Sequence, residues 1–380
     1  MRLTEAEGKA ILARHGVARP RGALLQGDSL PAGAGADAWP GLVLKAQIPE
    51  GGRGKRGLVR RVTAAELPAA RAAMLEILGD PEAGFLLEEA AEIERELYLA
   101  LRVDGTAQTI EAMIGPEGGV EVESNVASLI RASLDPEAPG AAEAIFARLG
   151  DALPPSLAAR VAREAVRLAR VMAAEDLSLL EINPLAVVGG RLVALDCKME
   201  RDDAAAFRHD RAATAASARL ESRALTPLER EARTRGFALV ELPGDVALVT
   251  AGAGLGMLMM DLLADEGLTA ACFMDNLVGG PADTTEARLE AAWTLAERAE
   301  VKAILFYTTL ASRPLGERVD HLLGFLANRP APKPVYAGFA AAPSAARGLD
   351  LDAARARLRA AGVVALHEDP RELVRAVAAA

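Results

Sequence analysis

Two short apolar segments that meet at a glycine pair constrain this chain more than any other feature. Leu179–Leu185 and Val193–Lys198 have the composition of strands, and Gly189 and Gly190 between them suit a tight hairpin turn. Successive side chains of a strand point to opposite faces, so pairing of the two segments gathers every second residue on one face. The polar residues gathered there are Glu181, Asn183, Asp196 and Lys198.

This polar face offers two carboxylates, one amide oxygen and one ammonium group. Oxygen ligands on rigid neighbouring strands suit Mg²⁺, a hard cation that accompanies nucleotide phosphates. The pattern therefore indicates a magnesium and nucleotide site. A surface hairpin with charged outward positions fits the same pattern, so both interpretations stay open at this point.

Composition excludes several classes of protein. With 380 residues, of which 51% are hydrophobic and 25% charged, the chain can bury large cores, and we expect two or three domains. No apolar run is long enough to span a membrane, and Met1–Glu5 lacks the apolar core of a secretory signal. We therefore expect a cytoplasmic protein without a membrane partner.

The net charge and the cysteines narrow the class further. A net charge of −10 and only 3% aromatic residues argue against a nucleic-acid surface. Cys197 and Cys272 lie in separate apolar segments, so neither a disulfide framework nor a cysteine-rich metal site is expected. We expect both thiols to be reduced and buried.

The N-terminal part of the chain contains a predicted helix and, further along, an apolar strand interrupted by a lysine. Thr4-Glu5-Ala6-Glu7 is a capping-box pattern that predicts a helix running to about Arg14. Further along, Lys45 interrupts the apolar segment Leu42–Ala46, and a lysine in a buried strand needs a partner. A protein carboxylate is the structural alternative, and a phosphate is the functional one.

A glycine-rich basic loop follows this strand. Residues Gly51–Gly57 interleave glycines with Arg53, Lys55 and Arg56. Glycine lets backbone N–H groups turn toward an anion and the cations neutralise it, so the composition suits a loop over phosphates. The spacing is not that of a Walker A motif, and a flexible basic surface turn has the same composition.

The C-terminal part alternates apolar strands with helical stretches. Val246–Thr250 runs into a glycine turn, and the later strands are separated by stretches such as Glu286–Glu297. This alternation predicts an α/β fold with a parallel sheet wound with helices. The later strands are Ala270–Met274, Lys302–Tyr307, Pro334–Gly338 and Gly362–Leu366.

The glycine turn after the first of these strands is not a dinucleotide fingerprint. In Gly252-x-Gly254-x-Gly256 the third glycine is out of register for that motif. The start of the helix that follows can still hold an anion.

Taken in order, several motifs are similar to those of one protein family. They are Lys45-Ala-Gln, Gly51-Gly-Arg-Gly-Lys, Leu87-Glu88, Glu96-Leu-Tyr-Leu, Gly118-Gly-Val-Glu121, Leu180-Glu-Ile-Asn-Pro-Leu, Leu195-Asp-Cys-Lys and Gly252-Ala-Gly-Leu255. The chain resembles the β subunit of succinyl-CoA synthetase, an ADP-forming acid:CoA ligase, over almost its whole length.

The resemblance implies a domain organisation and a set of substrates. An ATP-grasp nucleotide-binding domain is expected over residues 1–225, a linker over 226–240 and a flavodoxin-like CoA-ligase domain over 241–380. ATP and coenzyme A are the implied substrates, and Mg²⁺ is the implied cofactor. Pro20 matches a position at which the ATP-using members resemble this chain, which favours ATP as the phosphoryl donor.

Roles carry over from the family to matching positions of this chain. Nucleotide contacts are implied for Lys45, Gly52, Arg53, Gly54, Glu88 and Glu96, with Glu88 in the adenine and ribose region. Magnesium ligands are implied at Asn183 and Asp196. Glu181 is implied as the catalytic residue that accepts a hydrogen bond from a phosphorylated histidine of a partner subunit.

The resemblance also implies that the partner is a separate α subunit. The four histidines of this chain are His15, His209, His321 and His367. None lies in a glycine-rich loop resembling the family's phosphorylated site. The phosphohistidine and the main CoA-binding domain are therefore expected on the α subunit.

The departures from the family pattern lie where the acid substrate is expected to bind. Donors that relatives offer to succinate are replaced, which makes succinate doubtful and points to another small carboxylic acid. Hydroxyls and a guanidinium could contact that acid, although Thr-Thr and Ser-Arg-Pro are also ordinary turn sequences. The acid-binding candidates are Ala251, Gly252, Thr308, Thr309, Ser312 and Arg313.

Three functions are compatible with these patterns. The first is the β subunit of an ADP-forming acid:CoA ligase with altered acid specificity, which the nucleotide-side motifs favour. The second is a non-catalytic interaction subunit that retains ATP binding. The third, a carboxylate–amine ligase of the ATP-grasp type, leaves the second domain without a role.

Overall fold

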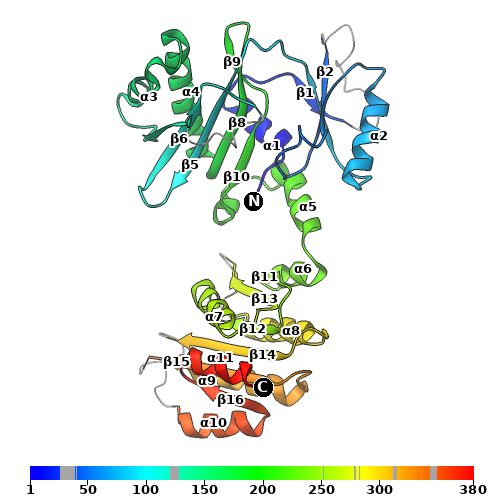
Figure 1. Ribbon diagram of the computed structural model, residues 1–380, viewed down its shortest axis with the longest axis vertical. Coiled ribbons are helices and arrows are strands. Elements are labelled where there is room, and N and C mark those ends of the chain that lie inside the picture. Colours follow the sequence, from blue (N-terminus) through cyan, green and yellow to red (C-terminus); the bar gives the residue numbers. More distant parts are fainter. Residues whose placement is uncertain are drawn as a thin grey trace. The chain divides into compact units, whose positions relative to one another are not determined.

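The computed structural model describes residues 1–25, 39, 41–119, 128–250, 252–277, 280–281, 283–310, 315–342 and 349–380. The chain divides into two compact units, Met1–Ser222 and Arg223–Ala380, and each contains its own hydrophobic cores (Figure 1). The overall class is mixed α/β, as the sequence predicts.

The first unit contains two antiparallel sheets. The four-stranded sheet has the order β1 (Gly22–Leu24), β4 (Phe85–Glu89), β2 (Leu42–Ala46) and β3 (Val59–Val62). The larger sheet has the order β10 (Lys198–Arg201), β8 (Leu177–Val188), β5 (Arg95–Asp104), β6 (Thr109–Gly115) and β7 (Ile130–Leu134), and β9 (Arg191–Ala194) also pairs with β8.

Each sheet of the first unit is covered by helices. The apolar face of α2 (Leu67–Leu78) packs on the four-stranded sheet, as Figure 1 shows, and α4 (Pro155–Ala174) packs on the larger sheet beside α3 (Ala141–Leu149). Helix α1 (Glu5–Arg14) begins at a complete capping box, which confirms that prediction. The remaining helical segments are Gly150–Ala152, Asp203–Arg208 and Ala212–Thr214, all 3₁₀, and α5 (Ala215–Ala224).

The second unit is built on a parallel sheet, as expected. Its order is β12 (Val246–Thr250), β14 (Ala303–Leu310), β15 (Val335–Ala341) and β16 (Val363–His367). Beside β12, strand β13 (Cys272–Asn276) pairs antiparallel with β11 (Phe237–Glu241), and a single parallel bridge joins Val246 to Ala270. β13 therefore pairs along its length with β11 and not with the parallel strand β12.

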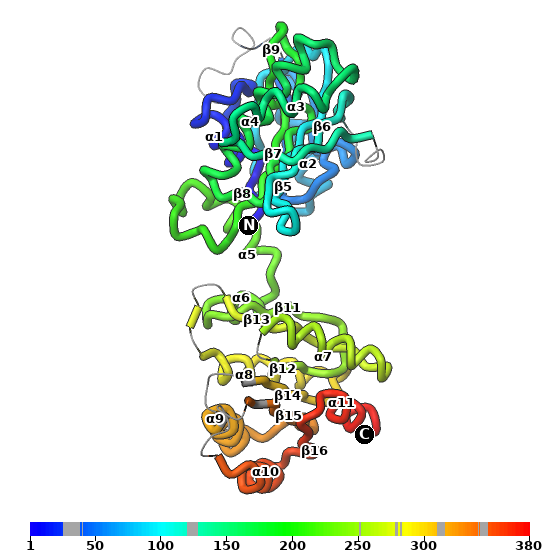
Figure 2. Tube along the Cα trace, turned by 90° about the vertical axis from the view of Figure 1, so that its left-hand side faces the viewer, coloured from blue at the N-terminus to red at the C-terminus, as the bar shows by residue number. Residues whose placement is uncertain are grey.

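Helices cover both faces of this parallel sheet. One core contains side chains of α8 (Thr285–Ala296), α9 (Leu315–Asn328) and α10 (Leu351–Ala360). The other contains side chains of α7 (Ala253–Asp265) and α11 (Pro370–Ala378). Figure 2 shows α9 and α11 on opposite sides of β14 and β15. The second unit is therefore a three-layer α/β sandwich.

Residues 226–240, expected to form a linker, instead hold regular structure within the second unit. Thr226 caps α6 (Pro227–Thr234) through a capping box with Glu229, and β11 follows at Phe237. This short helix exposes Arg230, Glu231 and Arg233 and buries Ala232 in the core of the second unit.

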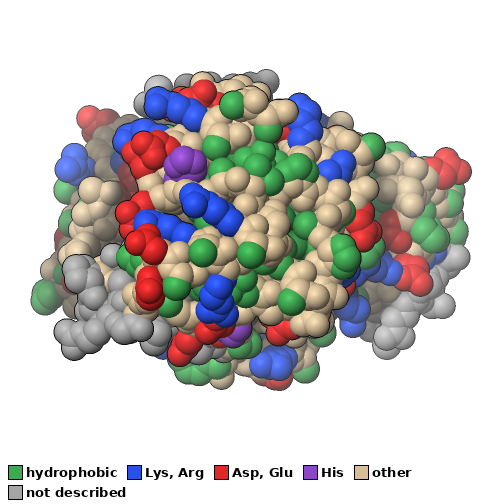
Figure 3. All heavy atoms as spheres, turned by 90° about the horizontal axis from the view of Figure 1, so that it is seen from below, with side chains coloured by type: hydrophobic (Ala, Val, Ile, Leu, Met, Phe, Trp, Pro, Cys, Tyr) green, Lys and Arg blue, Asp and Glu red, His purple; other side chains and the backbone are tan. Residues whose placement is uncertain are grey.

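The cysteines and the surface of the protein can be compared with the sequence-based expectations. Both cysteines are free and buried, as predicted, and burial raises the pKa of the Cys272 thiol to about 12. Among the described helices, none has the length and apolar character needed to cross a bilayer. On the face drawn in Figure 3, acidic and basic side chains are interspersed.

Candidate nucleotide and metal site

A cavity of about 320 Å³ in the first unit gathers most of the residues that the sequence singles out. Its wall is formed by the glycine-rich basic loop on one side and by β8 and the segment before β10 on the other. The predicted residues that line it are Gly52, Arg53, Gly54, Glu96, Glu181, Asn183 and Asp196. The fold therefore brings seven predicted residues, from four separate segments of the chain, to one cavity.

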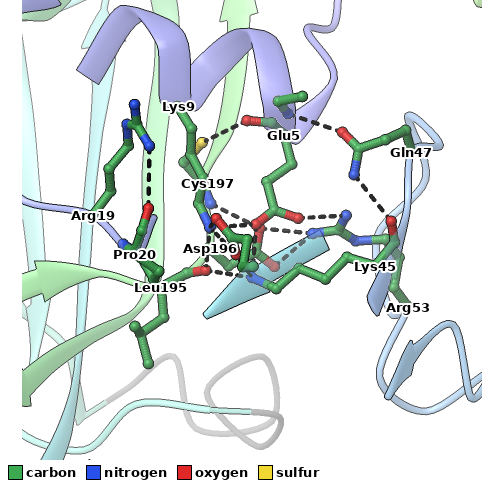
Figure 4. A network of polar contacts seen from close by, with 12 residues as sticks. Glu5, Lys9, Arg19, Pro20, Lys45, Gln47, Arg53, Leu195, Asp196 and Cys197 are labelled. Carbon is green, nitrogen blue, oxygen red and sulfur yellow. Dashed lines mark hydrogen bonds and ion pairs between the residues drawn. The ribbon is translucent and has the colours of Figure 1, made fainter. Parts of the chain in front are cut away.

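The hairpin that carries this site forms as predicted, with one difference. β8 turns at Gly189 and Gly190, both at positive φ, and pairs with β9. The returning chain then breaks before β10, which pairs with the same β8 and sets Lys198 opposite Glu181. The break frees the carbonyl of Leu195 and turns Asp196 toward the cavity (Figure 4).

Beneath the cavity, two lysines share two buried carboxylates. Lys45 Nζ lies 2.8 Å from Glu5 Oε1, 2.7 Å from Glu88 Oε2 and 2.5 Å from the carbonyl oxygen of Leu195. Lys9 Nζ lies 2.8 Å from Glu5 Oε1 and 2.5 Å from Glu88. Of the two partners left open for Lys45, the structure shows protein carboxylates.

Arg53 connects this buried group to the cavity. Its guanidinium donates to both carboxylate oxygens of Asp196, at 2.7 and 2.8 Å, and lies 2.7 Å from Glu5 Oε2. It also donates to the carbonyl of Ala46 at 3.0 Å. Figure 4 shows Lys9, Lys45 and Arg53 around Glu5 and Asp196. With Glu88, the network contains three cations and three carboxylates. We call Glu5, Lys9, Lys45, Arg53, Glu88 and Asp196 the charge cluster.

The charge cluster shifts the proton equilibria of its members. Burial opposes the charge of Glu5, but Lys9, Lys45 and Arg53 hold the pKa of its carboxyl well below its usual range. Burial also opposes ionised Lys45, yet Glu5 and Glu88 raise its pKa above the usual value. Burial and the nearby charge of Glu5 raise the pKa of Asp196, and Arg53 works against that rise.

On β8, Asn183 is held by a glycine. Its Oδ1 accepts a hydrogen bond from the N–H of Gly119 at 2.8 Å, and its Nδ2 donates to the Gly119 carbonyl at 3.2 Å. Gly119 has φ +101, and a Cβ there would lie 2.9 Å from Glu96 Oε2, so the position requires glycine. The Gly118-Gly119 segment thus closes this wall of the cavity.

The donors present fit a magnesium–nucleotide complex. Among the described residues no three His, Cys, Asp or Glu side chains form a metal-binding group. Mg²⁺ that carries phosphates needs only one or two protein carboxylates, because phosphate oxygens and water complete its octahedron. One carboxylate, Asp196, and one amide oxygen, Asn183, on the same wall match that requirement.

Two of the predicted nucleotide contacts, Lys45 and Glu88, do not line the cavity, and two residues of the charge cluster were not singled out from the sequence. Glu88 is only 1% exposed and lies under the cavity in the charge cluster, not on its wall. From the sequence, Glu5 and Lys9 are indicated only as residues of the first helix. Their spacing of four residues, on the helix face that also buries Gly8 and Leu12, is the signal that could have revealed them.

The candidate acid-binding residues belong to the second unit. Gly252 precedes α7 at φ +97, Thr308 is 2% exposed and Thr309 is exposed. Ala251, Ser312 and Arg313 lie outside the described residues. The structure therefore describes half of this predicted set.

Comparison with known proteins places these features in context. A family model described as an ATP-grasp domain matches residues 2–187. The chain is 34% identical to the ADP-forming succinate–CoA ligase subunit beta of Ignicoccus hospitalis over 296 residues, which cover 74% of this chain and 75% of that protein. It is 34% identical to the protein of the same description from Bordetella pertussis over 325 residues, covering 80% and 82%.

A solved structure resembles the chain over its full length. The ATP citrate lyase of Methanosaeta concilii, in complex with (3S)-citryl-CoA, has a TM-score of 0.68 and 17% identity, and the match covers 100% of this chain and 98% of that one. At this identity the likeness concerns the fold alone, and it supports an ATP-grasp domain followed by a parallel-sheet domain.

Proposed function

The chain belongs to the family of ADP-forming succinate–CoA ligase β subunits, and from that premise we propose that it is the nucleotide-using subunit of an ADP-forming carboxylic acid:CoA ligase. Family membership indicates a ligase that uses ATP and coenzyme A and works with an α subunit. The finer steps below, the magnesium site and the identity of the acid are part of the proposal.

The cavity in the first unit carries this proposal. Its lining combines a glycine-rich loop, one carboxylate and one amide oxygen for a cation, and a further glutamate, Glu181. A surface hairpin would leave these side chains apart in solvent. Their convergence on one cavity favours the nucleotide interpretation over that alternative.

In the proposed nucleotide complex, Arg53 changes partner. One guanidinium nitrogen, Nη2, donates to both carboxylate oxygens of Asp196, and arginine also forms charge-assisted hydrogen bonds to phosphate oxygens. A phosphate that accepts these bonds releases the Asp196 carboxylate. When bound between Asp196 and Asn183, Mg²⁺ would supply charge neutralisation to the phosphates.

The residues of this chain then favour phosphoryl transfer by position and charge. The N–H groups of the Gly52–Gly54 loop and the guanidinium of Arg53 stabilise negative charge on the γ-phosphoryl group as it leaves ADP. A histidine of the α subunit receives the phosphoryl group, and Glu181 accepts the N–H of that imidazole. The phosphoryl group passes to the carboxylate of the acid, and the thiolate of coenzyme A displaces phosphate to give the acyl-CoA.

Replacing Glu181 is expected to slow phosphoryl transfer without unfolding the chain. Glu181→Gln loses a charge-assisted hydrogen bond of about 1.5–3 kcal/mol, so the rate of histidine phosphorylation should fall roughly 10- to 150-fold. The measurement is transfer of labelled phosphate from ATP to the α subunit in a single turnover. Glu76→Gln, an exposed residue on α2, is the matched control.

Acid-labile label on this chain in the absence of its partner would contradict the proposed division of roles. An unchanged transfer rate in Glu181→Gln would remove Glu181 from the mechanism while leaving the ligase function standing.

Succinate is expected to be a poor substrate. In the sequence, the segments that follow β12 and β14 offer the acid a glycine turn and hydroxyls, and they lack the paired amide and glycine donors that suit succinate. A panel of small carboxylic acids, assayed with the α subunit for CoA-dependent ADP release, should rank another acid above succinate in kcat/KM. Succinate at the top of the panel would refute this prediction, and turnover of no acid would favour a non-catalytic ATP-binding subunit.

A further inference from the structure

A second cavity of the first unit lies apart from the nucleotide site. It has a volume of about 1080 Å³ and is formed by α4, by the residues that lead into α3 and by the turn between β8 and β9 (Figure 1). None of the described residues that line it also lines the nucleotide cavity. We call this cavity the arginine groove, because five arginines line it: Arg160, Arg163, Arg167, Arg170 and Arg191.

Four of these arginines form one row along α4. They recur at intervals of three, four and three residues, which places them on the same side of the helix. The opposite side of α4 is buried in the core of the first unit, through residues such as Val161, Leu168 and Met172. At a rise of about 1.5 Å per residue, the row from Arg160 to Arg170 extends over about 15 Å.

Three of the five arginines have no acidic partner among the described residues. Arg163 and Arg191 form no ion pair with any of them. Arg160 donates only to main-chain carbonyls, that of Ser156 at 3.4 Å and that of Gly190. Because these acceptors are uncharged, they leave the charge of the guanidinium uncompensated.

The other two arginines have partners that are easily exchanged. Arg167 lies 3.8 Å from Glu164, and Arg170 lies 3.3 Å from Glu137, whose side chain is 78% exposed. Ion pairs between exposed side chains contribute little to stability. With Glu143, three glutamates line the groove against five arginines. The groove is therefore a local surplus of positive charge on a chain whose net charge is −10.

The rest of the lining indicates which kind of anion fits. Apolar side chains contribute to it, among them Val166, Val171 and Leu192. The described lining residues include no Phe, Tyr or Trp, so the bases of a nucleic acid would find no such ring on which to stack. The arginines follow one another along the groove and do not converge on one point. A single small anion therefore reaches only one or two of them.

An extended acidic peptide matches the spacing of the row. Every second side chain of an extended chain points to the same side, and two such side chains lie about 6.6 Å apart. Neighbouring arginines of the row are separated by about 4.5–6 Å along the axis of α4, and their long side chains cover the difference. Each guanidinium can bind one carboxylate through charge-assisted hydrogen bonds.

We propose that the arginine groove binds an acidic segment of a protein partner, extended and with carboxylates at alternate positions. The carboxylates pair with the row on α4, and the smaller side chains between them contact the apolar part of the lining. This docking surface is separate from the proposed ligase function, because the groove and the nucleotide cavity share no described residue.

A synthetic peptide tests the proposal on the whole chain. The peptide alternates four glutamates with four threonines and carries a fluorescent label, and its counterpart has glutamine in place of each glutamate. Fluorescence anisotropy should show that the glutamate peptide binds, that salt weakens this binding, and that the glutamine peptide does not bind. Arg163→Gln combined with Arg167→Gln should weaken the binding roughly tenfold.

Two exposed arginines outside the groove provide the matched control. Arg148→Gln combined with Arg219→Gln removes the same charge from the first unit and should leave the affinity within about twofold of the wild type. Arg191→Gln changes a different element and should also weaken binding, so a distorted α4 would not explain the loss. Arg163→Lys combined with Arg167→Lys should restore part of the affinity, because the charge is kept.

Three results would overturn the proposal. Equal weakening in the two double glutamine variants would show a general attraction between the peptide and basic charge. Lack of peptide binding to the wild type would remove the docking surface. The third result is a preference for phosphate groups. If tripolyphosphate or a single-stranded oligonucleotide binds more tightly than the peptide, and Arg163→Gln combined with Arg167→Gln abolishes that binding, the groove serves another class of ligand.

Discussion

Glu5→Gln is expected to lower the unfolding midpoint of the first unit by roughly 6–20 °C, because it leaves three buried cations with two carboxylates. Breaking a buried ion pair on one side costs about 3–5 kcal/mol, and one kcal/mol corresponds to about 2–4 °C in a unit of this size. Glu5 contacts Lys9, Lys45 and Arg53, and its side chain is 1% exposed. Calorimetric unfolding of the whole chain is the measurement.

Two comparisons make this result specific to the charge cluster. Glu76→Gln removes an exposed carboxylate and should change the midpoint little. Adding Lys9→Met to Glu5→Gln restores the balance of two cations and two carboxylates, so the double variant should be more stable than the sum of the single effects predicts. Additive effects would show that the cluster is not energetically coupled.

The stabilisation that Glu5 gives to the first unit should decrease as the pH falls. The pKa of Glu5 is lower in the folded chain than in the unfolded chain, so the folded chain binds fewer protons at this carboxyl. The stabilisation is therefore present at neutral pH and is lost progressively as the pH falls below the usual range of a glutamate. The difference between the wild type and Glu5→Gln should shrink over that interval.

Local structure was predictable where a pattern of side chains decides it. The strand at Leu42–Ala46 and the helix ending at Arg14 match β2 and α1, because alternation, capping residues and glycine stops act over a few positions. The parallel strands of the second unit were predictable for the same reason. The break at Leu195–Cys197 was not, because a continuous apolar strand and an interrupted one have the same composition.

Long-range pairing explains what the sequence did not reveal. Glu5 and Glu88 meet Lys45 only after two strands and a helix have packed, and no local pattern indicates which carboxylate a lysine will meet. The family motifs contain four of the six residues of the charge cluster, and they do not contain Glu5 and Lys9.

Asp196→Asn is expected to abolish the magnesium-dependent part of ATP binding. The substitution keeps the size of the side chain and a hydrogen-bond acceptor for Arg53, but it removes the carboxylate that the proposed site offers to the cation. The affinity for ATP with Mg²⁺ should fall at least about tenfold, or ~1.4 kcal/mol, whereas the weaker affinity without Mg²⁺ should change little. Asp151→Asn, at an exposed position of the first unit, should behave as the wild type.

The claim on which the whole account depends is that the cavity between the glycine-rich loop and β8 binds MgATP. Isothermal titration of ATP into the wild type and into Asp196→Asn, each with and without Mg²⁺, tests it most directly. The account predicts that Mg²⁺ tightens ATP binding to the wild type and has no such effect on Asp196→Asn. Both proteins should show the cooperative unfolding transition of a folded chain. Equal tightening by Mg²⁺ in the two proteins, or no ATP binding to the wild type, would contradict it.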